Sequence, residues 1–182
     1  MKGIIFTCLR DHVEEAAGIE AWEECLDAVS PESDGVYVGT ANYSDAELFA
    51  IVGQLSKQLG APIPDLVRGF GVYLLPRLID VYPDKQVTEG GAQAFLGRIG
   101  GVIHEEVYKL FPDARPPCVR VVDESPGKMR LEYHSKRKLS ALAEGLIEGT
   151  AQHFGITIEQ QVSCSIVEDA ESCTFDLTFS DG

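Results

Sequence analysis

Motifs that mark common hydrolytic and nucleotide-binding enzymes are missing from this 182-residue sequence. It has no GxSxG, no HExxH and no phosphate-binding glycine loop, and no nucleophile-and-base pair stands out. Long apolar runs are also missing, and none approaches the roughly 20 residues that a membrane-spanning helix needs. The N-terminal stretch MKGIIFTCLRDH has too short an apolar part for a signal peptide, and charge follows at Arg10 and Asp11. We therefore expect a cytoplasmic protein that is not an enzyme.

Positive charge is scarce. The sequence has 15 basic and 29 acidic residues, which gives a net charge of -14 at pH 7. A surface of this sign repels nucleic acid and anionic membranes, so neither is expected as a partner. Apolar residues still make up 45% of the chain, enough for one globular domain with a real core.

The five cysteines form no CxxC motif. An odd number without such a motif favours the reduced state that is typical of the cytosol. Cys8 and Cys25 lie in apolar helical patterns and are expected in the core. Cys164 and Cys173 are spaced C-x8-C, which is weak evidence for a metal site without two further ligands.

Helical periodicity dominates the first two thirds of the chain. Gly18 and Gly60 are expected to end helices, and Ser44 with Glu47 has the spacing of a capping box. Pro76 predicts a kink or a break within its helix. The predicted helices cover residues 2–18, 19–29, 43–60, 64–82 and 92–111.

After residue 117 the pattern changes to the alternation of β-strands. Pro126 and Gly127 are placed as in a type II turn between two of these strands. The predicted strands cover residues 118–124, 128–135, 156–167 and 173–179, with one helix at 139–154. The predicted fold class is therefore α+β, with a helical N-terminal half and a four-stranded antiparallel sheet that contains an inserted helix.

One strand aims polar side chains at the predicted core. If the alternation that begins at Met129 and Leu131 continues, Tyr133, Ser135 and Arg137 point inward too. Two hydroxyls and a guanidinium on one face suit a ligand that carries carboxylates on an apolar body. The alternative is a set of ordinary polar residues at a strand end, with Ser140 capping the next helix.

His104 adjoins the apolar stripe of the predicted helix 92–111. A lone histidine in such a place is more often a structural residue than a ligand. The inward-facing Tyr, Ser and Arg side chains favour a ligand-binding role for His104, because such a set of donors is expected to bind a buried anion nearby.

The segments MKGIIF, IHEEVYKLFPDARPP and YHSKRKL through AEGLIEG resemble the H-NOX family of heme-nitric oxide/oxygen-binding domains, in its bacterial stand-alone type. The most specific feature is His104 together with the Y-x-S-x-R motif that begins at Tyr133. The resemblance implies a single domain, 1–182, with an N-terminal helical lobe (1–61) and a heme-ligating lobe (62–182). It also implies a ferrous heme b enclosed by the two lobes.

The resemblance also assigns roles to residues. His104 matches the proximal iron ligand, and Tyr133, Ser135 and Arg137 match the residues that bind the heme propionates. Pro117 matches the proline that distorts the heme. The resemblance further implies that Gly71 and Gly145 are hinges between the lobes.

The residues that match the distal pocket are Leu9, Leu74 and Leu142, all aliphatic. Oxygen-binding members carry a tyrosine where this chain has Leu142, so the resemblance implies selectivity for nitric oxide over oxygen. Some members hold zinc near the C-terminus. Cys164 and Cys173 match two of those ligands, but Ser140 and Gln161 stand where the other two would be, so zinc is not expected.

The function implied is a gas sensor in which nitric oxide releases His104 from the iron; carbon monoxide should bind as well. We expect no output domain on the same chain, so a separate histidine kinase or cyclic-di-GMP enzyme is the expected partner. Two alternatives stay open: an oxygen sensor of the same fold, and a heme-free binder of small apolar carboxylates. An absorption spectrum would separate the latter, because a Soret band requires heme.

Overall fold

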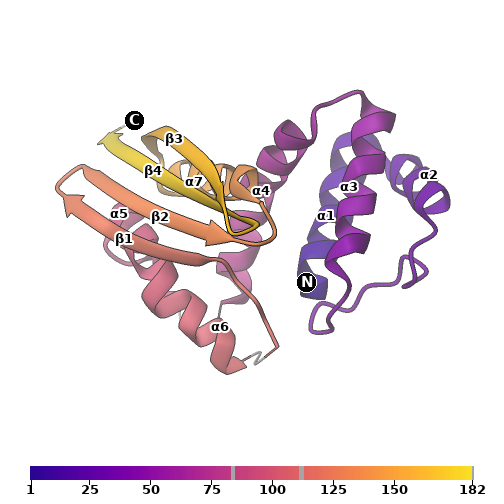
Figure 1. Cartoon of the computed structure of the whole chain (residues 1–182), viewed down its shortest axis with the longest axis horizontal. Coiled ribbons are helices and arrows are strands. Elements are labelled where there is room, and N and C mark those ends of the chain that lie inside the picture. Colours follow the sequence, from indigo (N-terminus) through magenta and orange to yellow (C-terminus); the bar gives the residue numbers. More distant parts are fainter. Residues whose placement is uncertain (83–84, 111–112, 182) are drawn as a thin grey trace.

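The N-terminal helices and the C-terminal sheet lie at opposite ends of the molecule, and helix α4 runs between them (Figure 1). The computed structural model describes residues 1–82, 85–110 and 113–181. Its element order is helices first and strands last, with one helix inside the strand region, as the sequence predicts. No helix in these three described segments is both long and apolar enough to cross a membrane.

The first three helices are α1 (Gly3–Ala17), α2 (Ile19–Val29) and α3 (Asp45–Leu59). The predicted stops are confirmed, since Gly18 and Gly60 follow α1 and α3 with positive φ angles of 92° and 66°. Cys8 and Cys25 are buried as predicted. These helices share a cluster of buried side chains that also takes in Phe70 and Leu74 of the next helix.

Half of the predicted capping box is wrong. The Ser44 hydroxyl does accept a hydrogen bond from the backbone N–H of Ala46, so it caps α3. The Glu47 carboxylate instead accepts hydrogen bonds from the hydroxyls of Ser33 and Tyr37. Glu47 therefore binds side chains of the preceding loop instead of the backbone N–H of Ser44 that a capping box would use.

Helix α4 (Ile63–Val81) continues through Pro76, so of the predicted kink or break the break does not occur, and the kink stays a prediction. Proline removes the hydrogen bond that the residue four positions earlier, Val72, would accept. The Val72 carbonyl oxygen faces the next layer, because a Cβ built on Gly149 would lie 3.0 Å from it. Packing against helix α7 (Ser140–Phe154) therefore holds α4 together where its own hydrogen bonding is interrupted.

The predicted helix 92–111 is not one regular helix. It is divided into α5 (Gly91–Arg98), a π-helical turn η2 (Ile99–Ile103) and α6 (His104–Leu110), preceded by a 3-10 turn η1 (Lys85–Thr88). The predicted last residue, Phe111, lies outside the described residues. His104 is thus the first residue of a short helix, directly after a widened turn.

The four strands are β1 (Cys118–Ser125), β2 (Lys128–Ser135), β3 (Ile156–Val167) and β4 (Ala170–Asp181). They form one antiparallel sheet in the order β1-β2-β4-β3, which confirms the predicted fold class. Gly127 has a φ of 75°, as the third residue of a type II turn requires. A second buried cluster joins the sheet to α5 and α7.

Candidate functional site

Strand β2 presents Tyr133 and Ser135 to the interior. Burial alternates along the strand, with Met129, Leu131, Tyr133 and Ser135 buried and the residues between them more exposed. The inward orientation predicted for these two polar residues is therefore confirmed. Burial is the main cause of the raised pKa of Tyr133, so its phenol is neutral and can donate a hydrogen bond.

Arg137 reaches the site from a turn rather than from the strand. β2 ends at Ser135, as predicted, so the alternation does not continue to residue 137. The turn is closed by the Ser135 hydroxyl, which accepts a hydrogen bond from the backbone N–H of Arg137 at 3.2 Å. Ser135 therefore helps to place Arg137, and the two residues form one local unit.

The Arg137 guanidinium contacts a residue of the N-terminal helices. Its Nε donates to the Asp45 carboxylate at 2.6 Å, and Nη1 donates to the backbone carbonyl of Arg115. Burial alone would raise the pKa of Asp45, but hydrogen bonds from Arg137 and from the amino group of Met1 lower it. Asp45 is therefore an anion that holds the arginine in place.

Asp45 is the site residue that the sequence analysis missed. It follows Ser44 at the start of α3 and is separated from Arg137 by 92 positions. In the sequence it is one acidic residue in the first turn of a helix, where acidic residues are common. Only the fold reveals its second role.

His104 combines burial with an unused ring nitrogen. Its Nδ1 atom is buried and makes no hydrogen bond to any residue that the structure describes. Burial lowers the pKa of His104 to about 4, against a smaller opposing contribution from the backbone of Pro117. The imidazole is therefore neutral at pH 7, which is the state in which histidine binds a metal.

A groove of about 550 Å³ runs along His104 and Pro117, between the η2–α6 segment and β1. None of Tyr133, Ser135 and Arg137 lines it, so the groove is not by itself a pocket for a ligand that all four residues could share. A larger shallow groove of about 630 Å³ includes Tyr133 but not His104.

The three leucines matched to the distal pocket lie together. Leu9 of α1 and Leu74 of α4 are buried in the N-terminal cluster, and Leu142 of α7 packs against it. Three tyrosines belong to the same cluster. The hydroxyls of Tyr37 and Tyr73 donate to the carboxylates of Glu47 and Glu15, whereas the Tyr43 hydroxyl accepts a hydrogen bond from the backbone N–H of Val38. Two of the three tyrosine protons are thus already used.

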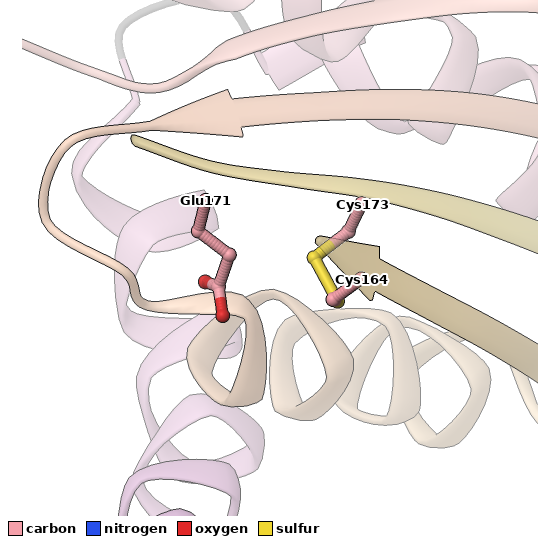
Figure 2. Close-up of side chains that lie close together, drawn as sticks. All are labelled: Cys164, Glu171 and Cys173. Atoms are coloured by element: carbon pink, nitrogen blue, oxygen red, sulfur yellow. A yellow bond between two sulfur atoms is a disulfide. The ribbon is translucent and has the colours of Figure 1, made fainter. Parts of the chain in front are cut away.

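Cys164 and Cys173 are joined by a disulfide between β3 and β4 (Figure 2). The prediction of reduced cysteines is therefore wrong for this pair. Glu171 lies beside them, and its carboxylate accepts a hydrogen bond from the backbone N–H of Ser140 at the start of α7. Because the two sulfurs are bonded to each other and the carboxylate has this partner, the three residues do not form a metal site as they stand.

The fold combines a half-buried neutral histidine, a phenol and a hydroxyl on the inner face of β2, and a guanidinium from the following turn, which are the kinds of side chain that bind a heme iron and its propionates. The model of the haem-NO-binding family matches residues 2–162. The chain therefore belongs to the haem-NO-binding, or H-NOX, family of heme-binding gas-sensor domains, which are sensors rather than enzymes. No curated protein matches the chain.

Solved H-NOX structures share the whole fold. An H-NOX protein from S. oneidensis in the Fe(II)NO ligation state is 33% identical, with a TM-score of 0.90 and 100% of both chains covered. An H-NOX domain from Shewanella oneidensis in the Fe(II)CO ligation state is also 33% identical, with a TM-score of 0.87 over 100% of both chains. An Fe(II) unliganded H-NOX protein from K. algicida is 29% identical, with a TM-score of 0.91 over 100% of this chain and 98% of that one.

Proposed function

We propose that this protein is a heme b sensor selective for nitric oxide over oxygen, with His104 as the iron ligand. The observation that carries the proposal is the buried Nδ1 of His104, which has no hydrogen-bond partner among the described residues. A buried polar atom without a partner costs about 1–3 kcal/mol. This cost is removed only when Nδ1 gains a partner, and burial already keeps the imidazole neutral, which is the state in which a ring nitrogen binds iron.

The remaining residues bind and orient the group. Tyr133 and Ser135 offer hydroxyl donors from the inner face of β2, and Arg137 offers the N–H groups that Asp45 and Arg115 leave unused. These donors suit the two propionates of heme b. Bound heme would supply a ferrous iron that takes nitric oxide or carbon monoxide as a ligand.

Leu9, Leu74 and Leu142 support selectivity against oxygen. Their aliphatic side chains offer no hydrogen bond, and two tyrosines of the same cluster, Tyr37 and Tyr73, already donate to Glu47 and Glu15. Bound oxygen would gain from a donor that these residues do not supply, whereas nitric oxide binds ferrous iron without one.

The test is the absorption spectrum of the reduced protein. We expect a Soret band that does not change in air and that shifts on addition of nitric oxide or of carbon monoxide. A stable oxygen complex would contradict the selectivity. Absence of a Soret band in protein supplied with heme would favour the heme-free carboxylate binder instead.

We propose further that His104 leaves the iron when nitric oxide binds, and that this change reaches a histidine kinase or a cyclic-di-GMP enzyme. The choice of partner rests on the family resemblance. Pro117 is proposed to distort the heme, so Pro117→Ala should give a flatter heme in a crystal structure of the ferrous protein, while Pro116→Ala should not. Equal distortion in wild type and Pro117→Ala would contradict this role.

A further inference from the structure

Two adjacent glycines lie in the π-helical turn directly before His104. Gly100 and Gly101 occupy the second and third positions of η2. Glycine within a helix costs up to about 1 kcal/mol relative to alanine, so two together work against a helix that is already short. Helix propensity therefore does not explain the two glycines, and the explanation must come from the residues around them.

The surroundings of the two glycines differ completely. A Cβ built on Gly100 would overlap the carbonyl oxygen of Val119 in β1 and lie 2.9 Å from the carbonyl carbon. A Cβ on Gly101 would have no atom within 4 Å. Gly100 thus allows two backbones to touch, whereas the position of Gly101 tolerates a methyl group.

This contact sets the start of the helix that carries His104. The backbone N–H of His104 donates to the carbonyl of Ile99, five residues earlier, and this hydrogen bond encloses both glycines. A π turn holds one residue more than an α-helical turn, so it redirects the following side chains by about 100°. The direction of the His104 side chain therefore depends on η2.

The strand that η2 touches belongs to the proposed propionate site. Val119 is two residues beyond Pro117 and pairs directly with Tyr133 across the β1–β2 ladder. Strand β1 thus lies between the turn that directs His104 and the strand that carries Tyr133.

We propose that Gly100 is a positioning residue for His104: by letting η2 rest on the backbone of Val119, it sets the distance and direction of the imidazole relative to β1 and β2. The proposal rests on the proposed function, because it takes His104 to be the iron ligand. A methyl group at position 100 must push η2 away from β1, and His104 moves with it.

The experiment compares Gly100→Ala with Gly101→Ala in the ferrous, heme-loaded full chain. Both substitutions remove a helical glycine, but only the first meets the Val119 backbone. The main measurement is the iron–histidine stretching frequency by resonance Raman spectroscopy, supported by the rate of heme loss. We expect Gly100→Ala to shift the stretch and to lose heme several-fold faster, and Gly101→Ala to match the wild type.

A third comparison tests whether the effect passes through His104. In a His104→Gly background supplied with imidazole, the iron ligand is no longer tied to α6. Gly100→Ala should then leave the iron–imidazole stretch unchanged. This background also covers the case in which Gly100→Ala alone yields no heme protein, since the double variant should still load heme with imidazole.

The outcomes separate the positioning role from the alternatives. An unchanged iron–histidine stretch in Gly100→Ala overturns the proposal, and so does an equal shift in both alanine variants. Failure of the double variant to load heme where His104→Gly loads it also overturns the proposal, because Gly100 would then be needed for folding rather than for positioning. A wild type without any iron–histidine stretch would refute the proposed function itself, and the positioning role with it.

Discussion

Replacing Arg137 with alanine should weaken heme binding far more than replacing Ser135. Arg137 supplies charge-assisted hydrogen bonds worth about 1.5–3 kcal/mol, whereas a neutral hydroxyl contributes about 0.5–1.5 kcal/mol. At 1.4 kcal/mol for each factor of ten, the heme dissociation constant should rise about 10- to 150-fold for Arg137→Ala. The same conversion gives about 2- to 12-fold for Ser135→Ala.

Loss of Arg137 also affects the fold, and the two effects must be separated. Arg137→Ala leaves Asp45 without the guanidinium that lies 2.6 Å from it, in a pair whose side chains are 21% and 34% exposed. At this exposure the pair is partly screened, so we expect a loss of only about 1 kcal/mol in unfolding free energy. Asp45 keeps its ion pair with the amino group of Met1, at 2.8 Å, so Asp45→Asn is the control for the fold: it removes the same pair with Arg137 but leaves the guanidinium for the propionates, and it should lose stability without the loss of heme affinity.

The pH of this comparison follows from Asp45. Its folded pKa is lowered, so its stabilising contribution is fully present above the unfolded pKa of about 3.9 and is lost as the pH falls through the folded value. At pH 7 the ion pair is therefore intact in the wild type.

The assay is equilibrium transfer of heme to an excess of a heme-scavenging apo-globin, followed by absorbance at pH 7. Chemical unfolding of each variant runs in parallel. Arg137→Lys is a further control, because it keeps the charge but loses the planar fork, and it should fall between the wild type and Arg137→Ala. Equal heme affinity in Arg137→Ala and Ser135→Ala would refute the reasoning.

Four further predictions concern His104, Leu142 and the disulfide. His104→Gly should lose heme that added imidazole restores. Because burial lowers the pKa of His104 to about 4, the wild-type iron–histidine bond should persist from pH 8 to pH 5, and a midpoint near pH 6.5 by absorbance would contradict this. Leu142→Tyr should raise oxygen affinity about ten- to a hundredfold in oxygen titrations, through a new hydrogen bond of about 1.5–3 kcal/mol. Cys173→Ser should lower the unfolding free energy by about 2–3 kcal/mol in urea titrations, through loss of the bond to Cys164, while the spectrum with nitric oxide stays unchanged.

The sheet and its helix could be predicted from the sequence because their signals are local. The strand predicted at 156–167 has the same bounds in the structure. The inward orientation of Tyr133 and Ser135 follows from alternation alone, since one face of β2 is buried. Turn chemistry at Gly127 completes the first hairpin.

The features that sequence reasoning missed depend on contacts between distant segments. Periodicity cannot register the extra residue of η2, because one π turn shifts the pattern without destroying it. The adjacent glycines Gly100 and Gly101 were the one feature of the sequence that could have indicated an irregular turn at this point. Glu47 and Asp45 both lie in the first turn of a predicted helix, yet each binds a partner outside that helix.

The residues proposed to lie on the two faces of the heme belong to different parts of the fold. His104 follows a turn that packs on the sheet, whereas Leu9 and Leu74 belong to the cluster of the N-terminal helices. A change at the iron can therefore move one side relative to the other only if the connections between them yield. Among the described residues, the contact of α4 with α7 and the pair Asp45–Arg137 are two such connections.

These two connections differ in how they can yield. A Cβ on Gly71 would lie 2.6 Å from the Leu142 carbonyl oxygen and 2.9 Å from the Cα of Gly145, so the helices meet there backbone to backbone. Side chains lock the helices on either side of this contact, where Arg68 pairs with Glu144 and Glu148, but none stands between Gly71 and Gly145, where the expected hinge lies. The ion pair, by contrast, is held by a long flexible side chain that can follow a small movement. We therefore expect the N-terminal helices to rotate at the contact between Gly71 and Gly145, while the ion pair Asp45–Arg137 stays intact. Arg137 would then remain bound to the propionates throughout the rotation.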